Sequence, residues 1–305
     1  MSWNPIIIGV EASPEAAQAA VFGCRLAQAT ATTCHLVHAM PDPWITGAEI
    51  GVPPDIDRLR EPFAERARAE IADALRDAGM TDPPDVQIRF GGSTRVLAEM
   101  ASERHAGLVV LGGKRHAALQ RWLGGSTAHS AARAVPVPLL VTRGHVHEPR
   151  RVLVAVDLSG AAKPTLRAAE RLAGIWDAEL RVVTVLEPLP TVPGAVVPQW
   201  MEFSALWEET LKRDVWSLVR RPRAQTIMRH GAVMEVLRRE VAEWRADLLV
   251  VGSHGKGWVD RMILGSMTER LLNELPTSLV VVPAAAALAP LGAAATPEPA
   301  RAVRK

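Results

Sequence analysis

The sequence contains no tyrosine and two cysteines among its 305 residues. Both cysteines, Cys24 and Cys34, lie near the N-terminus, and no Cys-x-x-Cys spacing occurs. Secreted domains that are held together by disulfides, and zinc-ribbon proteins, use more cysteines in paired spacings. The cysteine content therefore argues against a disulfide framework and is compatible with a reducing compartment.

Long apolar runs are also missing. No uninterrupted span approaches the ~20 residues that a membrane helix needs, and the N-terminus lacks the basic, apolar and small-residue order of a signal peptide. The formal net charge is +2, the pI is about 8.8, and the basic residues are scattered along the chain. These absences predict a cytoplasmic protein that binds neither nucleic acid nor a membrane.

An internal repeat is present instead. A shift of 146 residues superposes residues 6–13 on 152–159, and a shift of 140 residues superposes residues 108–126 on 248–266. The length of the chain fits two domains of roughly 140 residues, each large enough to bury a core. We therefore predict a first domain over residues 1–143, a linker over 144–150, a second domain over 151–283 and an Ala/Pro-rich disordered tail over 284–305.

A glycine-rich loop in the second half predicts a phosphate site. The apolar segment 246–251 leads into Gly252, and Gly255, Gly265 and Ser266 follow. Glycines let backbone N–H groups approach an anion without a Cβ in the way, and a helix beginning at Ser266 directs its positive dipole end toward that anion. We therefore expect this loop to hold phosphate groups.

Each half alternates short β-branched runs with helical patterns, which indicates βαβ units and a parallel sheet with helices on both faces. In such sheets ligands bind at the carboxyl ends of the strands. Asp157, Val185 and Gly252 follow such ends and are expected to line one crevice. In the second half we expect strands over 151–156, 180–186, 224–229, 248–251 and 278–282, and helices over 163–175, 205–219, 232–244 and 266–275.

These motifs together resemble the universal stress protein family in its tandem-domain form. The family fingerprint is Gly, two residues, Gly, nine residues, Gly and then Ser or Thr. It is complete in Gly252, Gly255, Gly265 and Ser266, and residues 154–159 read Val-Ala-Val-Asp-Leu-Ser. The resemblance covers nearly all of the chain before the Ala/Pro-rich tail.

The resemblance implies two Rossmann-like domains of the adenine-nucleotide α-hydrolase type, each a five-stranded parallel sheet of order 3-2-1-4-5. It implies that the fifth strands, expected at 137–142 and 278–282, pair inside the chain or in a homodimer. It also implies ATP as the ligand, as in the ATP-binding subfamily. Asp157 would either hydrogen-bond the nucleoside or help to hold Mg²⁺ through water, and a cap on the following helix is its structural alternative. The expected contacts in the second half are Ala155, Val156, Asp157, Val185, Gly252, His254, Gly255, Gly265, Ser266, Met267 and Thr268.

The first half departs from the fingerprint at two positions. Glu11 stands where the second half has Asp157, and Arg115 replaces the second glycine of the loop. An arginine can add a charge-assisted contact to a phosphate or fill the space that the phosphate needs, and both outcomes are open. The candidate contacts in the first half are Gly9, Val10, Glu11, Ala39, Gly112, Arg115, Gly125, Ser126 and Thr127.

Three local patterns have structural alternatives. Residues 266–269, Ser-Met-Thr-Glu, also fit a helix capping box. Cys34 and His38 fall on the opposite face of a strand from His35, so no metal site is predicted. The aromatic run within residues 200–207 fits core packing, and the Pro-rich segment before it fits a lid or a partner surface.

We predict an ATP-binding, stress-responsive regulator or sensor whose second domain holds the better nucleotide site. A Walker-type loop, a two-metal carboxylate pair and a Ser/His/Asp constellation are missing, so no catalytic residue is assigned and slow ATP hydrolysis is the most that we expect. The alternatives are an adenine-nucleotide hydrolase or adenylating enzyme, which would turn over rapidly with an acceptor, and a nucleotide-free dimerisation module, which would leave both sites empty.

Overall fold

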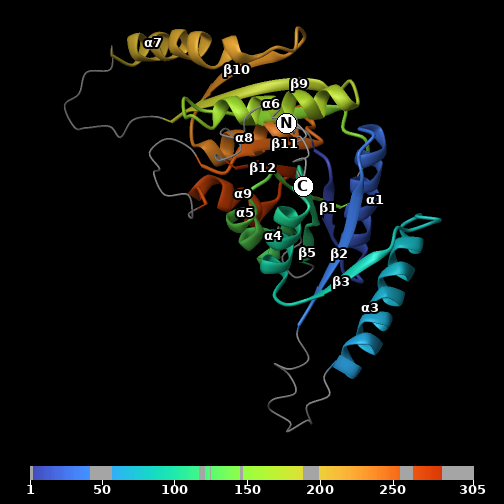
Figure 1. The fold of residues 1–305 in the computed structure, drawn as a ribbon. Coiled ribbons are helices and arrows are strands. Elements are labelled where there is room, and N and C mark those ends of the chain that lie inside the picture. The colour runs from blue at the N-terminus through green and yellow to red at the C-terminus, as the bar shows by residue number, and fades with distance from the viewer. Residues whose placement is uncertain are drawn as a thin grey trace, which may run out of the picture.

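A computed structural model of the chain describes residues 3–41, 57–116, 121–123, 125–144, 147–187, 199–254 and 264–283. Strands and helices alternate through both halves (Figure 1). The first half contains β1 (Ile6–Gly9), α1 (Pro14–Ala29), β2 (Cys34–Met40), α3 (Asp57–Asp77), β3 (Val86–Phe90), α4 (Ser93–Glu103), β4 (Leu108–Gly112), β5 (Lys114–His116), β6 (Arg121–Leu123), α5 (Gly125–Ala134) and β7 (Leu139–Thr142). The second half contains β8 (Arg151–Ala155), α6 (Ala162–Ile175), β9 (Glu179–Leu186), α7 (Gln199–Asp214), a 3-10 turn (Trp216–Leu218), β10 (Gln225–His230), α8 (Val233–Trp244), β11 (Leu248–Gly252), α9 (Ser266–Glu274) and β12 (Ser278–Val282).

Ten of these strands form one sheet, in the order β10-β9-β8-β11-β12-β7-β4-β1-β2-β3. Within each half the five strands are parallel and follow the order 3-2-1-4-5. The predicted α/β fold class is thereby confirmed. The fifth strands β7 and β12 are antiparallel neighbours, with Leu140 opposite Val280, so the structure pairs them inside the chain. We call this β7–β12 pair the seam.

The apolar strands separate two layers of core. Ile7 of β1 packs in one cluster and its neighbours Ile6 and Ile8 in the other, because successive side chains point to opposite faces of a sheet. Both clusters extend across the seam. Leu140 and Val280 share one of them, although they come from different halves. The two halves therefore have continuous cores and do not pack as separate bodies.

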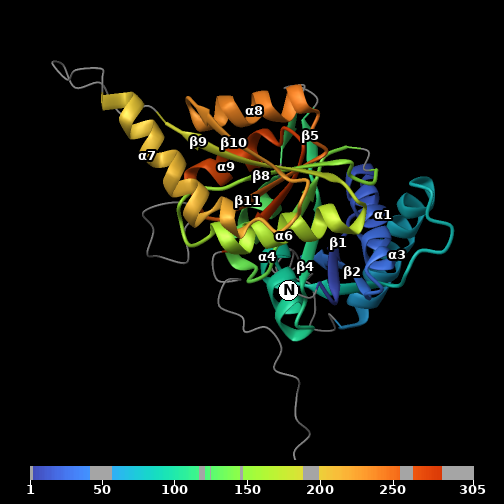
Figure 2. The ribbon, with the colours of Figure 1, turned by 90° about the horizontal axis from the view of Figure 1, so that it is seen from above.

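Four helices cover each face of the sheet. Buried side chains of α1, α3, α6 and α7 belong to one cluster, and those of α4, α5, α8 and α9 belong to the other. In α6, Leu166, Ala169 and Leu172 recur three residues apart and form its buried stripe. The helices α3 and α7 lie at opposite ends of the molecule (Figures 1 and 2).

Polar and aromatic contacts reinforce the junction of the two halves. The Arg143 backbone N–H donates to the Ser278 hydroxyl at 3.0 Å, and the Arg143 guanidinium donates to the Pro276 carbonyl. Arg133 of α5 pairs with Glu269 of α9 at 2.8 Å. Phe22 and Trp176 add a ring contact across the halves, with centroids 5.5 Å apart.

The second-half elements lie where the sequence predicts them, with one exception. α7 begins at Gln199 and ends at Asp214, whereas the expected helix covered residues 205–219. Core packing is wrong for Leu206, which is 62% exposed. The side chains of Trp200 and Phe203, most of the Pro-rich segment and the tail at 284–305 lie outside the described residues. No described helix combines the length and the apolar character that a bilayer span requires.

Candidate functional site

Each half of the sheet has a cavity at the carboxyl ends of its strands, and the two differ in size. The second-half cavity measures about 420 Å³ and the first-half cavity about 90 Å³. Ligand pockets commonly measure about 300–1,000 Å³, so the second cavity is large enough for a small molecule. Its lining includes these sequence-predicted residues: Ala155, Val156, Asp157, Val185, Gly252, His254, Gly265, Ser266, Met267 and Thr268. Gly255 lies outside the described residues.

Close backbone packing at the start of α9 forms one wall of the second cavity. The Gly265 N–H donates to the Ser253 carbonyl at 2.8 Å, and a Cβ on Gly265 would lie 3.1 Å from that same oxygen. Gly265 is the N-cap of α9, and no side chain caps this helix. The capping box that residues 266–269 could have formed is therefore not made, because Ser266 is already the first helical residue. The N-terminus of α9 keeps its positive dipole end directed at the cavity.

Thr268 connects α9 to the end of β11. Its hydroxyl donates a hydrogen bond of 2.9 Å to the Gly252 carbonyl, and its side chain is 3% exposed. The hydroxyl hydrogen of Thr268 is therefore donated within the protein and is not available to a ligand. At the corresponding position the first half has Ala128, which cannot make this bond.

Some polar groups of the second cavity have hydrogen-bond partners in the described part of the chain, and others do not. The Ser159 backbone N–H donates to an Asp157 carboxylate oxygen at 3.0 Å, which holds that side chain in place. His254 Nδ1 and the Ser253 hydroxyl share a bond of 2.8 Å, while His254 Nε2 is buried and has no hydrogen-bond partner in the described part of the chain. Burial lowers the pKa of His254, so the ring is neutral at pH 7 and Nε2 carries either a proton to donate or a lone pair.

Several residues that line the second cavity were not predicted from the sequence, among them Thr184 and Trp207. Thr184 of β9 is 3% exposed, and its hydroxyl has no hydrogen-bond partner among the described residues. Trp207 of α7 also lines the cavity, although its position suggested only core packing. A buried threonine in an apolar strand looks like any β-branched strand residue, so the sequence gives no signal for Thr184. Buried groups of this kind normally require a partner.

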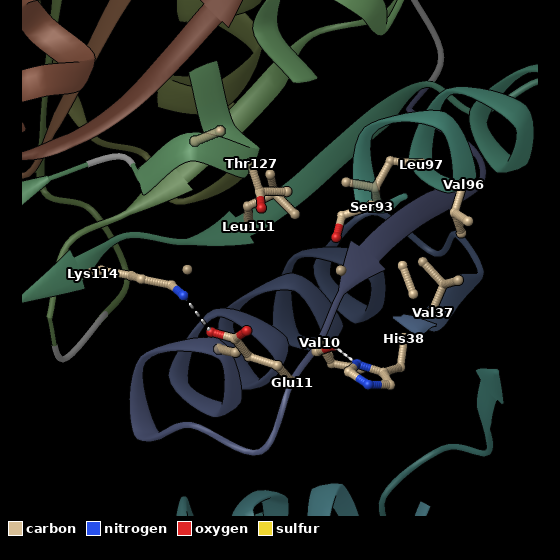
Figure 3. A pocket seen from close by; sticks show the side chains of 15 residues that line it. Val10, Glu11, Val37, His38, Ser93, Val96, Leu97, Leu111, Lys114 and Thr127 are labelled. Atoms are coloured by element: carbon tan, nitrogen blue, oxygen red, sulfur yellow. Dashed lines mark hydrogen bonds and ion pairs between the residues drawn. The ribbon is translucent and has the colours of Figure 1, made fainter. Parts of the chain in front are cut away.

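Side chains that line the first cavity are bonded to neighbouring groups (Figure 3). Lys114 Nζ pairs with a Glu11 carboxylate oxygen at 3.3 Å, and His38 Nδ1 bonds the Val10 carbonyl at 2.7 Å. The start of α1 also approaches closely, because a Cβ on Gly112 would lie 2.7 Å from the Glu15 carbonyl oxygen. The same atom on Gly252 would find its nearest neighbours at 3.2 Å. Tighter packing and a satisfied ion pair therefore account for the smaller volume.

The first-half candidates divide between residues that line this cavity and residues that do not. The cavity is lined by Gly9, Val10, Glu11, Ala39, Gly112 and Thr127. Ser126 is exposed and does not line it, and Gly125, the first residue of α5, lies outside the residues whose burial is described. Arg115 pairs with Trp122 in the β5–β6 hairpin, but its side chain lies outside the described residues.

Cys34, His35 and His38 are close in sequence and are of the types that bind metal ions. Within the described ranges, no group of three or more His, Cys, Asp and Glu side chains could hold a metal ion. Cys34 instead faces Cys24, with the sulfurs 3.4 Å apart.

Fold and site together define a class of protein: two tandem Rossmann-like α/β domains, with an open cavity at the strand ends of the second. The family model described as the universal stress protein family matches residues 2–143 and again residues 148–283. The chain belongs to the universal stress protein family, as its motifs indicated.

One relative and one solved structure are similar to the chain over most of its length. A universal stress protein of Mycolicibacterium smegmatis is 27% identical over 292 residues, which cover 91% of this chain and 96% of that protein. The crystal structure of a universal stress protein from Archaeoglobus fulgidus covers 92% of this chain and 99% of its own, with 17% identity and a TM-score of 0.63.

Proposed function

We propose that the chain binds ATP in the second-half cavity and uses this binding to act as a stress-responsive regulator or sensor. The observation that carries the proposal is the cavity of about 420 Å³ at the ends of β8, β9 and β11, where the glycine fingerprint and the uncapped start of α9 meet. The backbone there can approach an anion closely, and the helix dipole favours negative charge. Membership of the universal stress protein family supports the stress-related role.

The residues present fit a nucleotide. A phosphate group would satisfy the backbone N–H groups at the start of α9 and the buried His254 Nε2. The Thr184 hydroxyl offers a hydrogen bond to another polar part of the ligand. Asp157 would hydrogen-bond the nucleoside or hold Mg²⁺ through water, where the ion would neutralise phosphate charge.

The first-half cavity is the poorer candidate. At about 90 Å³ it is well below the size of common ligand pockets. A nucleotide there would have to displace the Glu11–Lys114 ion pair and face the Glu11 carboxylate. We therefore propose one ATP for each chain, bound in the second half.

The first experiment is to denature the purified protein, identify any released nucleotide by chromatography, and measure its ratio to protein. About one ATP for each chain is expected, and two would show that the first cavity also opens. If none is released, ATP is titrated into the protein by calorimetry. Absence of binding at millimolar ATP would overturn the proposal and favour a nucleotide-free dimerisation module.

A matched pair of variants tests the location of the site. Asp157→Asn keeps one oxygen for the Ser159 N–H but removes the charge, and we expect ATP affinity to fall roughly tenfold, because hydrogen bonds to charged groups contribute about 1.5–3 kcal/mol. Glu11→Gln makes the corresponding change in the first half and should leave the affinity unchanged. An equal loss in both variants would contradict the assignment to the second half.

Hydrolysis separates a regulator from an enzyme. We expect ADP formation that is slow compared with ATP dissociation, since no catalytic constellation was assigned at the cavity. Rapid multiple turnovers, with or without an added acceptor, would contradict the regulator role and indicate a hydrolase or an adenylating enzyme.

A further inference from the structure

The two cysteines of the chain are neighbours in space. Cys24 lies on α1 and Cys34 is the first residue of β2, and their sulfur atoms are 3.4 Å apart. Both are free thiols and both are partly exposed. A disulfide needs about 2.05 Å between the sulfurs, so the two atoms have to approach by about 1.4 Å.

The turn between the two cysteines is ordered by its own hydrogen bonds. The Thr30 hydroxyl donates to the Leu26 carbonyl at 2.7 Å and shares a bond of 2.9 Å with the Thr32 hydroxyl. The Thr32 N–H donates to the Ala27 carbonyl at 2.9 Å. In the folded chain the turn already brings the two cysteines together, although they are ten residues apart in sequence. Little further chain entropy is therefore lost when the disulfide forms.

We propose that Cys24 and Cys34 form a reversible intramolecular disulfide when the protein meets a hydroperoxide. This modification site is independent of the nucleotide cavity. The second half lacks it, because the repeat places Glu170 and Leu180 at the two corresponding positions. Oxidation thus acts on the first half alone, where it links the middle of α1 to the start of β2.

The two sulfurs have different roles. The hydrogen bond from the Cys24 thiol lowers the pKa of Cys34, which favours the thiolate form of Cys34. The same contact and burial raise the pKa of Cys24. The thiolate is the form that attacks peroxides, so Cys34 is the attacking residue and Cys24 the resolving one.

The reaction proceeds in two balanced steps. The Cys34 thiolate attacks one oxygen of the hydroperoxide, the O–O bond breaks, and a sulfenic acid forms while the released alkoxide or hydroxide takes up a proton. Cys24 sulfur then attacks the Cys34 sulfur, the S–O bond breaks, and the hydroxyl leaves with the Cys24 proton as water. Two thiols are oxidised to one disulfide, and the peroxide is reduced to an alcohol or water together with that second water. A dithiol reductant reverses the change.

The test uses the full-length protein and hydrogen peroxide at a few equivalents. After alkylation under non-reducing conditions, the number of free thiols should fall from two to none, and the intact mass should fall by two hydrogen atoms. Trypsin cuts after Arg25 and so separates the two cysteines, which means that a linked peptide pair shows the disulfide directly. Two free thiols after treatment, or links between chains in place of links within them, would overturn the proposal.

Two variants test the roles of the sulfurs. Cys24→Ser should stop at a Cys34 sulfenic acid that a 1,3-dione reagent traps, and Cys34→Ser should leave Cys24 unmodified at the same peroxide dose. Equal peroxide reactivity of Cys24 in the Cys34→Ser variant would contradict the assigned order. The wild-type measurement does not depend on whether either variant folds.

Discussion

The Thr268 hydroxyl and the Gly252 carbonyl, 2.9 Å apart, join the first turn of α9 to the strand that precedes the glycine loop. This bond fixes the start of α9 relative to the end of β11, so the backbone N–H groups of the first turn of α9 are held in place without a ligand. The first half, with Ala128 in place of Thr268, lacks this fixed point.

Replacing Thr268 with valine should therefore affect both stability and binding. The variant keeps the shape but leaves the Gly252 carbonyl without its partner, which should cost about 1–3 kcal/mol of unfolding free energy. ATP affinity should also fall, because α9 is no longer fixed. Urea unfolding and calorimetric titration measure the two effects, and Thr268→Ser should restore both. Normal affinity in a clearly destabilised valine variant would show that the bond has no part in binding.

His254 should make the protein less stable in mild acid. Burial lowers the pKa of His254 in the folded state below the unfolded value of about 6.5. As pH falls, the unfolded chain therefore binds a proton at His254 before the folded chain does, and the folded state loses stability. The resulting loss of unfolding free energy is absent well above pH 7. It grows as pH falls through the pKa of the unfolded state toward the lower pKa of the folded state. His35, whose pKa is also lowered by burial, adds a loss of the same sign.

The contribution of His254 is isolated by comparison with His254→Asn, whose amide can still reach Ser253. Melting temperatures of the two proteins should differ by a constant amount above pH 7, and the difference should shift in favour of the variant between about pH 6.5 and pH 5. A difference that does not change with pH would contradict the prediction.

Glu240 of α8 is a buried carboxylate between two arginines. It is 3% exposed, pairs with Arg181 at 3.3 Å and accepts a hydrogen bond from Arg229. Glu240→Ala removes the carboxylate that the two guanidinium groups share in a partly buried position and should cost about 3–5 kcal/mol. Glu274→Ala, which removes the exposed pair with Arg238, is the control and should cost under about 1 kcal/mol. Similar losses in urea unfolding would show that burial of Glu240 is unimportant.

Continuity of the core across the seam predicts that the halves unfold together. Leu140 is fully buried opposite Val280, and Leu140→Ala should cost about 2–5 kcal/mol. Tryptophan fluorescence and far-UV circular dichroism should give coincident urea transitions in the wild type and in the variant. Leu206→Ala at an exposed position is the control and should leave the midpoint unchanged. Two separate transitions would contradict a shared core.

Much of the fold could be predicted because the strands are short, apolar and separated by clear turn and helix signals. The start of α7 was missed, since the Pro-rich segment before it resembles loop and the helix begins immediately after Pro198. Leu206 was misplaced because its spacing fits a buried stripe, whereas its side chain is exposed in the described part of the chain. The pattern alone also could not distinguish pairing within the chain from pairing between chains, because a fifth strand presents the same edge to either partner.

The arrangement of the candidate site was partly predictable. The glycine fingerprint and the parallel sheet were enough to bring Asp157, Val185 and Gly252 to one cavity. The size of the first cavity was not predictable, because it depends on how closely the Glu15 carbonyl approaches Gly112 and on a salt bridge between Glu11 and Lys114. Such distances depend on packing in three dimensions and leave no local pattern.

The antiparallel seam also determines where the two cavities lie relative to each other. Since all strands of one half run opposite to those of the other, their carboxyl ends, and the cavities there, lie at opposite edges of the sheet. Under the proposed ATP binding, any change that the nucleotide causes at the second cavity would arise at one edge of the sheet, and the first cavity would lie at the other edge.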